Sequence, residues 1–169
     1  MRTCLLLTLS VFLLASCSDD EGQPSGDLTE FNFYDNATLS FDYPYVVEGN
    51  SLVFERYFER KDEPHIADDE YSDQFFFEIV PEGGSFLLED EALLSTNATF
   101  NTFCFCAPTD VFQITGGTIS GNERNGVWNV SVDISYSMGV RDPQTGTVTE
   151  VYSDVLVFDG LHTAKERPM

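Results

Sequence analysis

The sequence has few cations and few residues of the types used for acid-base or metal chemistry. Its 169 residues include 8 lysines and arginines against 29 aspartates and glutamates, 2 histidines and 4 cysteines, and the formal net charge is −21. Nucleic acids and anionic lipid surfaces bind proteins through cationic side chains that release counterions. The composition therefore excludes nucleic acid as a partner, and it excludes charge-driven attachment to an anionic membrane.

Recognisable catalytic motifs are also lacking. The chain has no Gly-x-Ser-x-Gly, His-Glu-x-x-His, phosphate loop or dinucleotide fingerprint. Neither His65 nor His162 lies near a motif that would make it a catalytic base, and we expect His162 in a C-terminal tail beyond the last strand. A pair of catalytic carboxylates would not stand out among so many acids. The favoured interpretation is that the chain is not an enzyme.

No apolar run is long enough to span a bilayer. The longest, residues 5–15, would form a helix of roughly 16 Å, about half of the ~30 Å hydrocarbon core. Arg2 precedes this run, and no acidic residue appears before Asp19. This order of residue types predicts a secretory signal peptide.

The apolar run ends in Leu-Ala-Ser-Cys at residues 14–17, which resembles the lipobox of bacterial lipoproteins. The resemblance implies that residues 1–16 are removed and that Cys17 carries a diacylglycerol and a fatty acid such as palmitate. The partner of the mature N-terminus would then be a membrane, reached through the lipid anchor. The alternative is an ordinary secretory signal that leaves Cys17 as a thiol.

Residues 17–27 are predicted to be the lipidated cysteine followed by a flexible acidic tether, because the segment after Cys17 has no aliphatic residue. Its start, Ser-Asp-Asp-Glu, resembles the export signal that sends lipoproteins of Bacteroidota to the outer face of the outer membrane. We therefore expect an envelope protein of the outer membrane that faces outward. An acidic linker kept soluble by its charge is the alternative.

Residues 28–169 are predicted to form a single all-β domain. Apolar and polar residues alternate between turn clusters, as expected for half-buried antiparallel strands. In residues 127–136 the apolar face consists of Trp128, Val130, Val132, Ile134 and Tyr136. We expect a five-residue hairpin loop at residues 122–126 and a last strand over residues 147–158. The pattern indicates an antiparallel β-sandwich of the immunoglobulin or jelly-roll type, with a small β-barrel as the alternative.

One unusual pair is Cys104 and Cys106, at the end of a strand that begins near Ala98. A disulfide, a soft-metal site and two buried thiols are the three interpretations. A regular strand separates the two Cα atoms by roughly 6.6 Å, whereas a disulfide needs Cβ atoms at ~3.8 Å, so a bridge requires a kink. The Cys-Phe-Cys tripeptide also resembles the copper(I) motif of the β-sandwich copper-delivery proteins that serve cytochrome c oxidase.

A second candidate site is the acidic segment at residues 62–70. Its carboxylates are the hard oxygen ligands that calcium prefers, although their spacing matches no calcium-loop template. The candidate ligands are Asp62, Glu63, Asp68, Asp69 and Glu70. A solvated acidic loop is the alternative, and no cofactor is required by the sequence.

Two function classes follow. The favoured one is a lipid-anchored, non-catalytic protein with a binding or structural β-domain, whose ligand, a protein or a glycan, is not identified by any motif. The alternative is an envelope metal-handling protein that binds copper(I) through Cys104 and Cys106.

Overall fold

The computed structural model describes residues 26–40, 42, 45–61, 70–80, 82–104 and 109–168. Strands make up most of this part of the chain, with one short helix between the fifth and sixth strands. The elements in chain order are β1 (Leu28–Leu39), β2 (Val46–Glu48), β3 (Ser51–Glu59), β4 (Ser72–Ile79), β5 (Ser85–Glu89), α1 (Asp90–Leu94), β6 (Ala98–Phe103), β7 (Val111–Arg124), β8 (Val127–Arg141) and β9 (Val148–Ala164).

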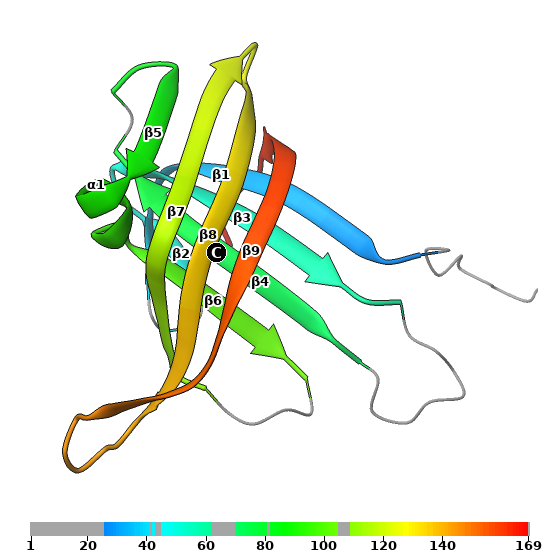
Figure 1. The fold of residues 1–169 in the computed structure, drawn as a ribbon. Coiled ribbons are helices and arrows are strands. Elements are labelled where there is room, and N and C mark those ends of the chain that lie inside the picture. Colours follow the sequence, from blue (N-terminus) through cyan, green and yellow to red (C-terminus); the bar gives the residue numbers. More distant parts are fainter. Residues whose placement is uncertain are drawn as a thin grey trace, which may run out of the picture.

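The strands form two layers that pack face to face. The paired strands follow the order β5-β7-β8-β9-β1-β3-β4-β6, and β2 pairs with β1. Strands β7, β8 and β9 cross in front of β1, β3, β4 and β6 (Figure 1). The two layers are connected by two parallel residue pairs between β1 and β9, Asn32 with Thr163 and Phe33 with Ala164. All other strand pairs are antiparallel, so the predicted all-β sandwich is confirmed, and within the described chain β5 and β6 do not pair to close a barrel.

Alternating side chains from both layers build the core. The five apolar residues of the alternating face of β8, predicted from the sequence, are all buried, whereas their polar neighbours are exposed. From the opposite layer, Phe54 and Phe77 lie in the same core with stacked rings 4.9 Å apart. Phe54 also meets the Trp128 ring edge-on at 5.6 Å. Aromatic packing between the sheets therefore accounts for much of the interior.

The hairpin between β7 and β8 is tighter than the sequence pattern predicted. Asn125 and Gly126 alone form the turn, with φ angles of 56° and 79°. Two successive positive φ angles are the requirement of the type I′ hairpin turn, and Asn-Gly is its preferred sequence. The expected five-residue loop over residues 122–126 was therefore wrong, and the ladder continues to the pair Arg124 and Val127.

The last strand is longer than predicted, and His162 belongs to it. β9 continues past Phe158 to Ala164, and His162 is completely buried, so its expected place in a C-terminal tail was wrong. The Phe31 ring covers Gly160, where a Cβ atom would lie only 2.5 Å from that ring. Because glycine has no side chain, the Phe31 ring fits against Gly160, and β9 continues past this position.

The outer face of the layer formed by β1, β3 and β4 carries a second, smaller apolar cluster. Tyr34, Val53 and Phe76 point away from the main core, and the cluster includes Val46 of β2. The chain after β9 also reaches this face, because Lys165, Glu166 and Pro168 line a cavity there together with Tyr34 and Phe76. Buried apolar side chains therefore lie on both faces of this layer, whereas the outward side chains of β8 are polar and mostly exposed.

Candidate functional site

A cavity of about 520 Å³ lies beside β6, the final strand of its sheet. Its volume falls within the range typical of small-molecule sites. Among the described residues, the lining contains four aromatic side chains and no acidic or basic one. The described lining residues are Tyr45, Phe100, Asn101, Thr102, Phe103, Cys104, Thr109, Met138, Val151 and Tyr152.

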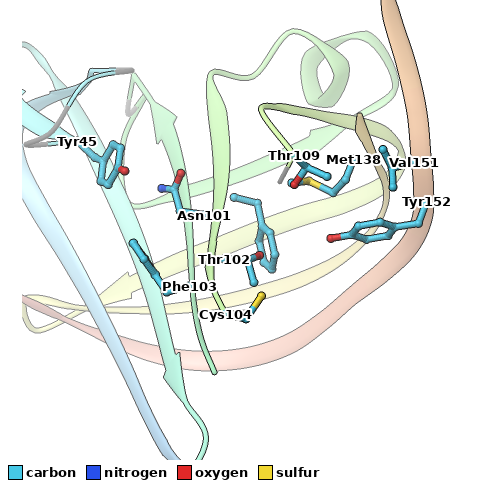
Figure 2. Close-up of a pocket in the computed structure, with 10 residues that line it drawn as sticks. Tyr45, Asn101, Thr102, Phe103, Cys104, Thr109, Met138, Val151 and Tyr152 are labelled. Atoms are coloured by element: carbon cyan, nitrogen blue, oxygen red, sulfur yellow. The ribbon is translucent and has the colours of Figure 1, made fainter. Parts of the chain in front are cut away.

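The position of β6 explains why residues from both sides of a sheet meet in one cavity. Among the described strands, β4 pairs with one edge of β6 and none pairs with the other. Figure 2 shows Asn101 and Phe103 on one side of the strand and Thr102 and Cys104 on the other. The cavity therefore wraps around an open strand edge.

The opposite wall comes from the hairpin of β8 and β9. Met138 and Tyr152 are direct partners in the β8–β9 ladder, and both line the cavity. The hydroxyl end of Tyr152 points towards Thr102 across the space (Figure 2). Burial and the nearby carboxylate of Asp154 raise the pKa of Tyr152, so its hydroxyl stays protonated and can donate a hydrogen bond.

Two polar atoms on lining residues have no hydrogen-bond partner among the residues that the structure describes. The Asn101 Nδ2 and the Thr102 Oγ1 are buried, and neither is hydrogen-bonded within the described part of the chain. A buried polar group without a partner costs about 1–3 kcal/mol. Because neither atom is accessible to solvent, a ligand in the cavity would reach them only after the side chains rotate.

A neutralised ion pair lies behind the inner wall. Asp73 is the β4 partner of Thr102 and forms a salt bridge with Arg56. The Tyr71 hydroxyl donates to Asp73 over 3.1 Å, and burial followed by the Asp73 charge raises the pKa of Tyr71 to about 12. The Arg56 guanidinium also lies 5.2 Å from the centre of the Phe58 ring. Because these groups satisfy one another, they add no unpaired charge next to the cavity.

The structure places one of the residues singled out from the sequence in this site. Cys104 lines the cavity and is disulfide-bonded. Its partner sulfur is outside the described residues, so a bridge to Cys106 stays a prediction. Cys17 is also outside the described residues, and it remains a prediction as the lipid carrier.

The described residues provide no geometric support for the predicted calcium site. Glu70 is exposed, and the other four candidate ligands, Asp62, Glu63, Asp68 and Asp69, lie outside the described residues. In the part of the chain that is described, no group of three or more histidine, cysteine, aspartate or glutamate side chains could hold a metal ion. The acidic segment therefore remains a hypothesis based on composition.

Most lining residues could not be found from the sequence. Tyr45, Asn101 and Tyr152 belong to three distant segments and carry no motif. Their only common property is proximity to the open edge of β6, which depends on the order of the strands in the sheet. The cysteine pair was the single local signal that marked this region.

Within the described ranges, no helix has the length and apolar character needed to cross a membrane. No family model matches this chain, and neither does any curated protein or solved structure.

Proposed function

We propose that this chain is a non-catalytic, lipid-anchored envelope protein that binds a small uncharged ligand in the cavity beside β6. The observation that carries the proposal is the lining itself. Four aromatic rings and a methionine line the cavity beside Asn101 Nδ2 and Thr102 Oγ1, which have no hydrogen-bond partner in the described part of the chain. The lining is mixed, with slightly more polar than apolar surface, and such a combination of aromatic rings and polar groups can hold and orient a small molecule.

The chemistry of the lining favours an uncharged ligand with a flat face. A charged ligand would meet no opposite charge in the cavity, because the described lining has no acidic or basic side chain. Anions are further disfavoured by the net charge of −21. Aromatic side chains such as Tyr152 and Phe103 bind flat rings by offset or edge-to-face contacts.

Phenol is a suitable first probe because it combines a flat ring with one hydroxyl. We expect phenol to shift the amide NMR signals of Asn101 to Cys104 and of Tyr152, whereas benzoate, which has the same ring and a charge, should not. Replacement of Tyr152 by alanine should weaken phenol binding about tenfold, equivalent to ~1.4 kcal/mol for a lost aromatic contact. The mature chain with Cys17→Ala serves for this titration, since it keeps every described residue.

Tyr57→Ala is the matched control for the phenol titration. Tyr57 is a partly exposed tyrosine of β3 that does not line the cavity. Its removal should leave phenol affinity unchanged. Equal affinity of the wild-type and Tyr152→Ala chains, or benzoate binding as tight as phenol binding, would contradict the proposed site.

The anchor part of the proposal rests on the sequence alone, since residues 1–25 lie outside the described residues. The Leu-Ala-Ser-Cys tetrapeptide supports lipid attachment at Cys17. Cys17→Ala should abolish incorporation of labelled fatty acid and move the protein from the detergent phase to the aqueous phase. Cys4→Ala, a change within the predicted signal peptide, should alter neither property. Labelling that persists in Cys17→Ala would rule out this anchor.

The copper(I) alternative is the less favoured function. Copper(I) binds cysteine as the thiolate, and a disulfide offers none. Because Cys104 is disulfide-bonded, metal binding there would first require a reductant. The cavity beside β6 needs no such step to accept a ligand.

A further inference from the structure

A second cavity, of about 350 Å³, lies on the outer face of the sheet formed by β1, β3 and β4. It contains one buried carboxylate among aromatic rings. The lining residues are Tyr34, Tyr45, Val46, Glu55, Gln74, Phe76, Lys165, Glu166 and Pro168. The side chain of Glu55 is only 5% exposed.

Neighbouring groups hold the Glu55 carboxylate in place without cancelling its charge. The Tyr34 hydroxyl donates to Glu55 Oε2 over 2.6 Å, and Asn32 Nδ2 donates to the same oxygen over 3.1 Å. Gln74 Nε2 donates to Oε1 over 3.3 Å. All three donors are neutral groups, since burial and the bond to Glu55 raise the pKa of Tyr34 and keep it protonated. Such bonds orient the carboxylate.

The only cation that the described structure brings to this carboxylate is Lys165. Its Nζ lies 3.6 Å from Glu55 Oε2 and 3.9 Å from Glu30 Oε2. The Lys165 side chain is 46% exposed, so it reaches the cavity from the rim and remains hydrated. A half-exposed lysine that shares two carboxylates neutralises a buried charge incompletely.

We propose that this cavity is a binding site for an organic primary ammonium ion. The ammonium group would lie on Glu55, and the attached carbon chain would pack on the rings of Tyr34, Tyr45 and Phe76. Lys165 then acts as a tethered competitor that presents the same chemical group to the same carboxylate.

Three properties of the site support this ligand class. A cation is attracted to the faces of aromatic rings as well as to a carboxylate, and the Tyr45 and Phe76 rings lie 5.9 Å apart in the lining. The strongly acidic chain raises the local concentration of cations. The carboxylate of Glu55 is already buried before a ligand binds. Binding therefore requires the desolvation of the ligand's ammonium group but little further desolvation of the carboxylate.

This inference goes beyond the proposed function, because it concerns a different cavity and a ligand of different charge. Tyr45 lines both cavities, so the two ideas need separate readouts. Phenol binding beside β6 should not depend on Glu55. Failure of amine binding with normal phenol binding would overturn only the ammonium site.

The test uses n-butylammonium as the probe and the Cys17→Ala chain as the protein. Lys165→Met keeps a long side chain but removes the competing charge, and it should tighten n-butylammonium binding roughly tenfold relative to the chain with Lys165. Adding Glu55→Gln to Lys165→Met should weaken binding at least tenfold. Calorimetry gives the affinities, and amide NMR shifts at Glu55 and Gln74 locate the ligand.

Glu30→Gln is the matched control, since it removes the same charge next to the same lysine but does not line the cavity. When Glu30→Gln is added to the Lys165→Met chain, the affinity for n-butylammonium should change by no more than about twofold. An equal loss with Glu30→Gln and Glu55→Gln would show non-specific attraction to an acidic surface and would overturn the site. Absence of binding to the Lys165→Met chain would overturn it as well.

Glu55→Asp provides an independent variant in case Glu55→Gln impairs folding. It keeps the charge but withdraws the carboxylate by one methylene group, so n-butylammonium affinity should fall several-fold. Melting curves and amide spectra of each variant establish that the sandwich is intact. Unchanged affinity in folded Glu55→Asp would contradict a direct contact with the carboxylate.

Discussion

Replacing Phe54 with alanine is expected to lower the free energy of unfolding by about 3–5 kcal/mol, the usual cost of removing a buried phenylalanine. Phe54 is completely buried, and its ring contacts side chains of both layers. Besides Phe77 of its own layer, it meets Trp128 and His162 of the opposite layer, with ring centres 5.6 and 5.5 Å away. The substitution therefore leaves a cavity between two sheets that cannot easily close.

Urea unfolding followed by circular dichroism measures this effect. Leu161→Ala is the control, because Leu161 is 66% exposed on β9 and its truncation should change the free energy of unfolding by less than about 0.5 kcal/mol. A loss below about 1 kcal/mol for Phe54→Ala would mean that this ring does not lie between the two layers.

The second large effect is acid destabilisation through His162. Burial lowers the pKa of His162 to about 4, from an ordinary value of 6.5. Its Nδ1 donates to the Gly160 carbonyl over 3.2 Å, whereas its Nε2 has no partner in the described structure. Phe31 and Phe54 lie against the ring, with centres 5.1 and 5.5 Å away. A proton on this imidazole would therefore be buried among apolar groups.

The direction of the pH dependence follows from which state binds the proton. Above pH 6.5 the imidazole is neutral in both states, and the stability that it contributes is fully present. As the pH falls from 6.5 towards 4, the unfolded chain takes up a proton that the folded chain does not. The expected loss is about 2 kcal/mol by pH 5 and about 3 kcal/mol below pH 4.

Urea unfolding at pH 8 and pH 5 tests this expectation, with His162→Phe as the comparison. Phenylalanine fills the same space without titrating, so this variant should lack about 2 kcal/mol of the acid destabilisation seen in the wild type. His65→Gln removes the other histidine and should retain the full effect. The same pH dependence in the wild-type and His162→Phe chains would show that carboxylates, not His162, are responsible.

The sequence pattern located strand faces well because alternation is a local property. Trp128 to Tyr136 alternate between core and solvent as expected, since successive side chains of a strand point to opposite faces. The ends of strands were less predictable. Asn125-Gly126 is a sufficient turn by itself, but the polar residues before it suggested a longer loop. The last strand was expected to end at residue 158, whereas β9 continues past Gly160, where the Phe31 ring occupies the space that a side chain would need.

The two candidate cavities show the limit of a local pattern. Cys104 could be singled out because its spacing from Cys106 is visible in the chain. Glu55 could not, because an acid on the outward face of a strand normally indicates solvent. It is buried because side chains of the neighbouring strands β1 and β4 and the chain around Lys165 contact it on that face.

The amino-acid sequence by itself determined the all-β class and the inward face of β8, since both follow from the period-two geometry of each strand. It did not determine that β6 ends a sheet, that Tyr45 and Tyr152 meet beside it, or that Glu55 is covered. Those features depend on which strands pair and which segments pack over the sheet. Strand pairing joins residues far apart in the chain, so only the tertiary structure decides where an edge is open and where a carboxylate is buried.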